Sequence, residues 1–274
     1  MTTKPASTSA DQSVGAGNRM DYNGFHSRDL GQGIHLLGGC FHATMYGNNF
    51  HTHASAYLIE GETGNILVDT GHSKDGKAIE EFVRSRVGGD LTYIFPTHEE
   101  YPHAGNLDQL MRAFPKAMTV GEVRNFHLYY PWHEADGRFR QMEPGEEIDL
   151  GDRRFIVLPA IIHDLPASLW GYDTKSETMF VSDGFAFSHT HDSECTLFST
   201  ELPSQPTLNE TRLVFDLALY WTKFAEKRDL VEATHKLLED YPTRLIAPAH
   251  GNVVDDPVAL SRVMDEVLLA PIPH

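Results

Sequence analysis

Short apolar runs alternate with helix-spaced apolar residues along most of the chain, from Gly31 onward. The runs have the length of buried strands, and several carry the β-branched and aromatic residues that pleated sheets favour. They cover residues 56–59, 65–69, 92–95, 154–158, 178–182 and 244–247. Gly61 and Gly64 separate the first two runs, which we therefore predict to pair as a hairpin.

Between these runs, apolar residues recur three and four positions apart, which is the spacing of an amphipathic helix. A clear case is Ile79, Phe82 and Val83, in a segment that ends at Gly88. The same spacing predicts helices over 107–114 and 257–269, and a long helical region over 217–241. Strands that alternate with helices predict a layered α/β fold. We place it at residues 31–274, as one domain without an internal repeat.

The beginning of the chain has a different composition. Residues 1–18 are mainly Thr, Ser, Ala, Gly and Gln, without the apolar core of a secretory signal. Such a segment cannot bury enough surface to order itself, so we expect a disordered tail over residues 1–30. No apolar run approaches the roughly 18 residues that a membrane span needs. These features predict a cytoplasmic protein.

Charge and cysteine content narrow the classes of partner. The chain has 22 Lys and Arg against 39 Asp and Glu, a formal net charge of −17. This charge repels nucleic acids and anionic membranes, so neither is an expected partner. The two cysteines, Cys40 and Cys195, lie outside any CxxC motif, which favours a reducing compartment. Buried structural thiols are the default interpretation of both.

Histidine is the most informative residue type. The chain has 16 histidines, and several form short clusters, namely His51 with His53, His98 with His103, and His189 with His191. In a protein with few cysteines, such clusters favour a metal site of imidazole and carboxylate ligands. A single histidine is more often structural or exposed. His189 and His191 follow Asp183 and lie either near its pocket or on the surface.

Four metal-competent residues each follow the carboxyl end of a predicted strand. They are Asp69, His98, Asp183 and His250. Ligands bind at this edge of layered α/β proteins, because the loops there are free to present side chains. The densest segment is residues 98–103, between a strand and a helix. Residues two apart on an extended segment point the same way, so His98 and Glu100 can share one ion while His103 turns toward a second.

Taken in order, these motifs resemble the five motifs of the metallo-β-lactamase superfamily. They are Asp69-Thr70-Gly71, the segment from His98 that ends in His103-Ala104-Gly105-Asn106, His163, Asp183, and Pro248-Ala249-His250-Gly251. Most hydrolases of that superfamily have a second histidine where this chain has Glu100. The HxE form, like the stretches 163–172 and 180–185, is similar to flavodiiron proteins and their oxygen-binding diiron relatives. The resemblance spans about residues 31–269 and implies an αββα sandwich with one dinuclear metal site.

Carried over position by position, the resemblance implies two neighbouring iron ions. The ligands would be His98, Glu100 and His163 for the first ion, His103 and His250 for the second, and Asp183 as a bridge. Glu100 and Asp183 are the expected catalytic residues. Asp69 matches a structural aspartate that supports the site without binding the metal.

One position departs from the family pattern. The family's aspartate ligand of the second metal falls at Pro102, which has no group that can bind an ion. His103, His250 and Asp183 can still hold a metal with open positions for water, O2 or substrate, or the second ion binds weakly and the site is mononuclear. His51 or His53 could fill the gap, since flavodiiron proteins also have a histidine near the site before the first hairpin.

Glu100 favours iron over zinc, because anionic oxygen ligands stabilise the ferric form, whereas zinc hydrolases prefer imidazole-rich sites. The resemblance thus implies a diiron oxidoreductase that binds and activates or reduces O2 or NO, with zinc or manganese as alternative metals. No flavodoxin segment follows, so electrons would come from a separate donor protein or from a small organic substrate. Two alternatives stay open: a zinc-dependent hydrolase of a lactone, ester or thioester, and a non-enzymatic O2 or NO sensor. A homodimer is compatible with all three.

Overall fold

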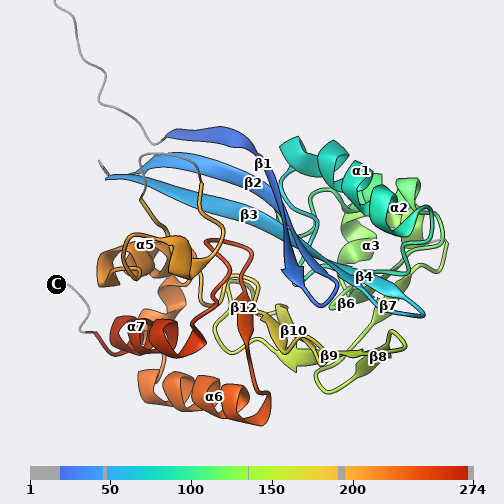
Figure 1. Ribbon diagram of the computed structural model, residues 1–274. Coiled ribbons are helices and arrows are strands. Elements are labelled where there is room, and N and C mark those ends of the chain that lie inside the picture. Colours follow the sequence, from blue (N-terminus) through green and yellow to red (C-terminus); the bar gives the residue numbers. More distant parts are fainter. Residues whose placement is uncertain (1–18, 46–47, 135, 191–194, 271–274) are drawn as a thin grey trace, which may run out of the picture.

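The computed structural model describes residues 19–45, 48–134, 136–190 and 195–270, which form two β-sheets with helices on their outer faces (Figure 1). The larger sheet has the strand order β1-β2-β3-β4-β5-β6-β7. Its strands are β1 (Arg19–Gly31), β2 (Ile34–Met45), β3 (Asn48–Glu60), β4 (Asn65–Val68), β5 (Tyr93–Phe95), β6 (Met118–Gly121) and β7 (Phe139–Gln141). The first four pair antiparallel, and β4 to β7 run parallel.

The smaller sheet has the order β12-β11-β10-β9-β8. Its strands are β8 (Glu147–Asp149), β9 (Arg154–Pro159), β10 (Leu169–Asp173), β11 (Thr178–Phe180) and β12 (Leu245–Ala247). All its pairs are antiparallel except that of β11 with β12. Each sheet therefore contains a parallel pair, β4 with β5 and β11 with β12, whose strands end in the same direction.

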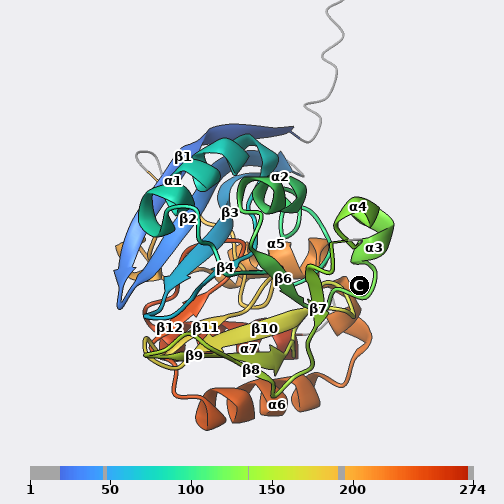
Figure 2. The same cartoon turned by 90° about the vertical axis from the view of Figure 1, so that its right-hand side faces the viewer.

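Helices cover the outer face of each sheet, as the two views show (Figures 1 and 2). Beside the larger sheet lie α1 (Gly76–Val87), α2 (Leu107–Ala113), α3 (Phe126–Tyr129) and α4 (Pro131–Glu134). Over the smaller sheet lie α5 (Leu208–Leu217), α6 (Lys227–Asp240) and α7 (Pro257–Leu269). Short 3-10 turns complete the described elements, η1 (Ser73–Asp75), η2 (Ser199–Glu201) and η3 (Tyr220–Phe224). This confirms the predicted αββα sandwich.

Aromatic rings fill the space between the two sheets. Phe155 of β9 contacts Phe95 of β5 and Phe180 of β11, with ring centroids 5.0 and 6.0 Å apart, and all three side chains are fully buried. The neighbouring strand must leave room for the Phe155 ring, because a Cβ atom at Gly171 would lie 2.1 Å from it. Separate apolar clusters join α1 and α2 to the larger sheet and α5, α6 and α7 to the smaller one.

Helix α7 begins and ends where its spacing predicts, at Pro257 and Leu269. Its start is well defined because the Asp256 side chain accepts a hydrogen bond from the backbone N–H of Ala259, and Pro257 stands in the first turn. The long helical region predicted over 217–241 is helical for most of its length, but it is interrupted. Helix α5 already ends at Leu217, η3 follows, and α6 begins at Lys227. The break lets the indole N–H of Trp221 donate to the backbone carbonyl of His163, 2.5 Å away.

The predicted disordered tail over residues 1–30 also needs correction, because β1 begins at Arg19. This strand pairs with β2 from Arg19 to Gly31, so backbone hydrogen bonds order it despite its polar composition. Residues 1–18 lie outside the described part of the chain. Within that part, no helix combines the length and apolar character that a membrane crossing requires.

Candidate metal centre

The four residues predicted at strand ends lie at one edge of the sandwich. Asp69 follows β4 and His98 follows β5, and these two strands are parallel neighbours. Asp183 follows β11 and His250 follows β12, the parallel pair of the other sheet. The carboxyl ends of both pairs therefore present their loops to the same place, between the two sheets.

Asp183 is the centre of this group. Its Oδ2 atom lies 3.5 Å from Nε2 of His103 and 3.7 Å from Nε2 of His98, and its Oδ1 atom lies 3.3 Å from Nε2 of His250. The side chains of His98, His103 and Asp183 are buried, whereas 27% of the His250 side chain is exposed. Ligand atoms of the three buried residues all lie within 4.8 Å of one another, so they could hold one metal ion.

A hydrogen-bonded layer behind the two buried histidines fixes their rings. One carboxylate oxygen of Asp69 accepts from the backbone N–H of Thr97 at 2.7 Å, and the other lies 3.0 Å from Nδ1 of His103. The Ser182 hydroxyl lies 3.1 Å from Nδ1 of His98 and 2.8 Å from the Thr97 hydroxyl. With each Nδ1 occupied, each Nε2 is left to face Asp183. Asp69 thus lies behind His103 on the side away from Asp183, and its supporting role stays a prediction.

The backbone is strained at two points of this layer. Asp69 and Ser182 have φ angles of 57° and 52°, in the left-handed region that residues other than glycine rarely adopt. Such conformations persist where the surrounding contacts enforce them, and they concentrate at functional sites. Here they turn both side chains back toward the histidines at the ends of β4 and β11.

Glu100 belongs to a second group, together with a residue for which no role is predicted from the sequence. Ligand atoms of His98, Glu100 and Asp164 lie within 4.8 Å of one another. Burial, the charge of Asp183 and a hydrogen bond with Glu100 raise the pKa of Asp164 to about 7. Two carboxyl groups this close share a proton unless a cation separates them. The only signal in the sequence was that Asp164 directly follows His163.

The charges around Asp183 also favour a cation. Burial lowers the pKa of His98, and the neighbouring His103 lowers it further, so His98 is a neutral imidazole, which is its metal-binding form. Burial also lowers the pKa of His103, but the carboxylates of Asp69 and Asp183 outweigh it and hold that pKa above its ordinary value. Burial alone would raise the pKa of Asp183, yet the adjacent imidazoles keep it low and the carboxylate ionised.

His163 is the one predicted ligand that the structure does not bring into either group. Its Nδ1 lies 3.0 Å from the carbonyl oxygen of Ala160, and its ring stacks on Trp221 with the centroids 4.8 Å apart. Neither does His53 face the gap that Pro102 leaves, because its two ring nitrogens lie 2.7 Å from the Gly251 carbonyl and 3.0 Å from the Cys195 sulfur. His51 has Nδ1 3.3 Å from the Cys40 sulfur.

Two further histidines belong to the predictions. His189 is buried rather than on the surface, pairs with His51 in an isolated β-bridge and lies 3.9 Å from the Cys195 sulfur. His191 lies outside the described residues.

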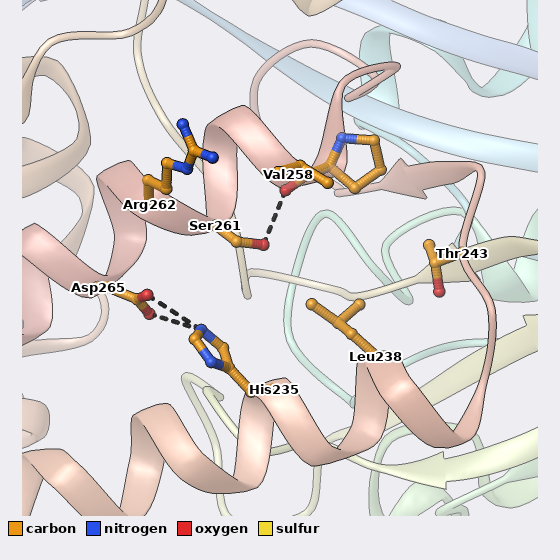
Figure 3. A pocket seen from close by; sticks show the side chains of 8 residues that line it. His235, Leu238, Thr243, Val258, Ser261, Arg262 and Asp265 are labelled. Atoms are coloured by element: carbon orange, nitrogen blue, oxygen red, sulfur yellow. Dashed lines mark hydrogen bonds and ion pairs between the residues drawn. The ribbon is translucent and has the colours of Figure 1, made fainter.

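A separate cavity of about 340 Å³ opens between α6 and α7 (Figure 3). His235 and Asp265 face each other across it, with Nε2 and Oδ2 3.0 Å apart. Its other lining residues include Leu238, Val258 and Arg262, and none of the predicted site residues is among them. We therefore treat the His235 side chain as a surface group unconnected with the metal centre.

Comparison with known proteins shows the family of this chain. The sequence pattern of the metallo-beta-lactamase superfamily matches residues 51–256. The anaerobic nitric oxide reductase flavorubredoxin of Salmonella typhi is 27% identical over 228 residues, which are 79% of this chain and 44% of that protein. Its counterpart in Pectobacterium carotovorum is 26% identical over 233 residues, or 80% of this chain and 43% of that protein. The chain thus spans less than half the length of these relatives.

Solved structures show the same fold. The rubredoxin oxygen:oxidoreductase of Desulfovibrio gigas superposes with a TM-score of 0.72 at 18% identity, over 88% of this chain and 61% of that one. A flavodiiron core from Synechocystis sp. PCC6803 gives a TM-score of 0.70 at 19% identity, over 89% of this chain and 60% of that one. The similarity covers the two-sheet sandwich that carries the residues around Asp183.

Proposed function

The chain belongs to the metallo-β-lactamase superfamily, and we propose that it is a diiron oxidoreductase that binds and reduces O2 or NO. The observation that carries this proposal is the carboxylate pair of Glu100 and Asp164 beside His98. A site built to activate water on zinc would hold imidazole there, whereas a metal that cycles to the ferric state is stabilised by anionic oxygen. The similarity to flavorubredoxins and to a flavodiiron core supports the same class.

The residues present fit two metal ions. We propose that His98, Glu100 and Asp164 hold the first, that His103 and His250 hold the second, and that Asp183 lies between them. Asp164 takes the place expected for His163, since it approaches His98 and Glu100 while the contacts of His163 run to Ala160 and Trp221. The fit rests on a buried ionised carboxylate that faces three imidazoles, and on two carboxyl groups close enough to share a proton.

The protein's own groups would prepare the site. When bound, the iron pair would supply the electrons that reduce O2 or NO. Asp69 and Ser182 hold the two buried imidazoles with Nε2 toward the ions, so little reorganisation is needed on binding. The proton shared by Glu100 and Asp164 would be released when a cation binds, which makes metal affinity rise with pH. The exposed side chain of Glu100 leaves this end of the site open to a small ligand.

The electron supply and the location are also proposals. We propose that a separate donor protein, or an organic substrate, delivers the electrons, since the reduction of O2 or NO needs a reductant. A cytoplasmic location agrees with two cysteines that form no disulfide bond. The homodimer stays a prediction.

Anaerobic reconstitution tests the proposal. The protein, loaded with ferrous iron, is mixed in a stopped-flow instrument with O2 and, separately, with NO. We expect an oxidised species with visible absorption, and its loss in Glu100→His, which removes one negative charge and creates an imidazole-rich site. His235→Ala, in the cavity between α6 and α7, is the matched control and should behave like the unmutated protein. No reaction with either gas, together with zinc-dependent hydrolysis of a lactone or thioester, would establish the hydrolase instead.

A further inference from the structure

A further cluster of metal-competent side chains, which we call the cysteine cluster, connects the first three strands with His189 and Cys195. It contains both cysteines of the chain, Cys40 on β2 and Cys195 beyond the smaller sheet's β11. Around them stand four histidines, His26 on β1, His51 and His53 on β3, and His189. Two sets of three residues stand out, and within each set the ligand atoms lie within 4.8 Å of one another. One set is His26, Cys40 and Cys195, and the other is His53, His189 and Cys195. None of these residues belongs to the centre around Asp183.

The sulfur of Cys195 belongs to both sets, and it has close neighbours in each of them. The sulfur of Cys195 lies 3.0 Å from the sulfur of Cys40 and 3.0 Å from Nε2 of His53. Two thiolates on one zinc ion, each about 2.3 Å from it, stand roughly 3.8 Å apart. The sulfurs therefore need to separate by less than about 1 Å to admit an ion between them. Both cysteines are free, so no disulfide bond stands in the way.

The surroundings prepare these groups as ligands. Nδ1 of His53 lies 2.7 Å from the carbonyl oxygen of Gly251, so its proton is held there and Nε2 presents its lone pair to the Cys195 sulfur. A hydrogen bond from Cys195 lowers the pKa of Cys40, which favours the thiolate. Nε2 of His26 is buried and has no hydrogen-bond partner among the described residues. A buried nitrogen in that condition is costly, and a metal ion nearby would satisfy it.

We propose that Cys40, Cys195 and His26, with His53 beside Cys195, form a second metal site for a thiophilic divalent cation such as Zn²⁺. Sulfur and imidazole ligands select such ions, whereas the carboxylate-rich centre around Asp183 selects harder ones. The site is independent of the proposed redox function, but it touches that centre. The backbone carbonyl of His53 lies 2.7 Å from Nδ1 of His250, so a bound ion would fix the strand that orients His250.

Cobalt substitution distinguishes this site from the centre around Asp183. Metal-free protein with both thiols reduced, as shown by titration of two thiols per chain, receives Co²⁺ under anaerobic conditions. The chain has only two cysteines, so a thiolate-to-cobalt charge-transfer band in the near ultraviolet reports on this site alone. We expect the intensity of the band at saturation to correspond to one thiolate-bound Co²⁺ per chain. Zn²⁺ should abolish it, because zinc displaces cobalt from thiolate sites.

Variants complete the test. Cys195→Ser should remove the band, and His26→Ala should weaken cobalt binding at least tenfold, while His98→Ala in the other centre should leave the band intact. Far-ultraviolet circular dichroism checks that each variant is folded. The proposal is overturned if the reduced, unmutated protein gives no thiolate band, or if the band survives in folded Cys195→Ser. It is also overturned if the protein as purified has a mass two hydrogens lower and gives no band after reduction, because the cysteines would then serve as a redox pair only.

Discussion

Replacing Asp164 by asparagine is the most direct test of the carboxylate pair. In the metal-free protein, burial, Asp183 and Glu100 raise the pKa of Asp164 from 3.8 to about 7. A carboxyl group whose pKa is higher in the folded state makes the protein less stable as pH rises from the unfolded value to the folded one. The loss begins near pH 4 and is complete above about pH 7. Asp164→Asn cannot ionise and should not show it.

The size of the effect follows from the two pKa values. A change from 3.8 to about 7 corresponds to about 4 kcal/mol, at 1.36 kcal/mol for each pH unit between them. Asp164 is only partly buried, so solvent screens its interactions, and we expect roughly half of that energy. Part of the loss falls below pH 5, where the unfolded chain is already ionised. Between about pH 5 and pH 8, Asp164 should therefore cost about 1 to 2 kcal/mol.

Urea unfolding of metal-free protein at about pH 5 and pH 8 measures this cost. The free energy of unfolding should fall between the two pH values by about 1 to 2 kcal/mol more in the unmutated protein than in Asp164→Asn. Asp90→Asn is the matched control, because Asp90 is exposed and pairs with Lys116 at the surface. Saturating Mn²⁺ should remove the difference by neutralising the pair. An identical pH dependence in Asp164→Asn and the unmutated protein would refute the assignment of Asp164 to the site.

Three other changes test the remaining parts of the structure. Pro102→Asp restores a carboxylate beside His103 and should raise iron content toward two per chain by elemental analysis, unless the unmutated protein is already full. His163→Ala should keep the metal content after dialysis and lower stability to urea by about 1 kcal/mol through the lost stacking on Trp221. A loss of metal in this variant would instead make His163 a ligand. Phe155→Ala should destabilise the protein by about 3 to 5 kcal/mol in the same assay, because Phe155 is fully buried between the sheets.

The fold could be predicted where local chemistry sets it. The 257–269 helix has a capping aspartate, a proline in its first turn and regular apolar spacing, and all three act within one segment. β1 had no such signal, since a strand ordered by pairing along its length needs no apolar run. The interruption of the helical region over 217–241 could not be predicted for a related reason. The apolar spacing continues through η3, and packing imposes the break there.

The candidate site also has a part that could be predicted from the sequence and a part that could not. Strand ends and residue types predict the convergence of His98, His103, Asp183 and His250, because parallel strands bring their carboxyl ends together. The role of Asp164 depends on which of two adjacent side chains in a loop turns inward, and no local pattern decides that. The cluster of Cys40 and Cys195 depends on a contact across 155 residues, which only the assembled sheets create.

Pro102 and Asp164 both make the two proposed metal positions differ in the number of their carboxylate ligands. Pro102 removes an anionic ligand from the position of His103 and His250, and Asp164 adds one beside His98 and Glu100. If both ions bind, the first position then has two carboxylates of its own, while the second shares only Asp183. Coulomb attraction for a divalent cation would accordingly be greater at the first of the two proposed positions, and a ferric ion would be stabilised most there. In the proposed site, the second position has two imidazoles and a partly exposed His250, so it would keep more open coordination positions for a small ligand.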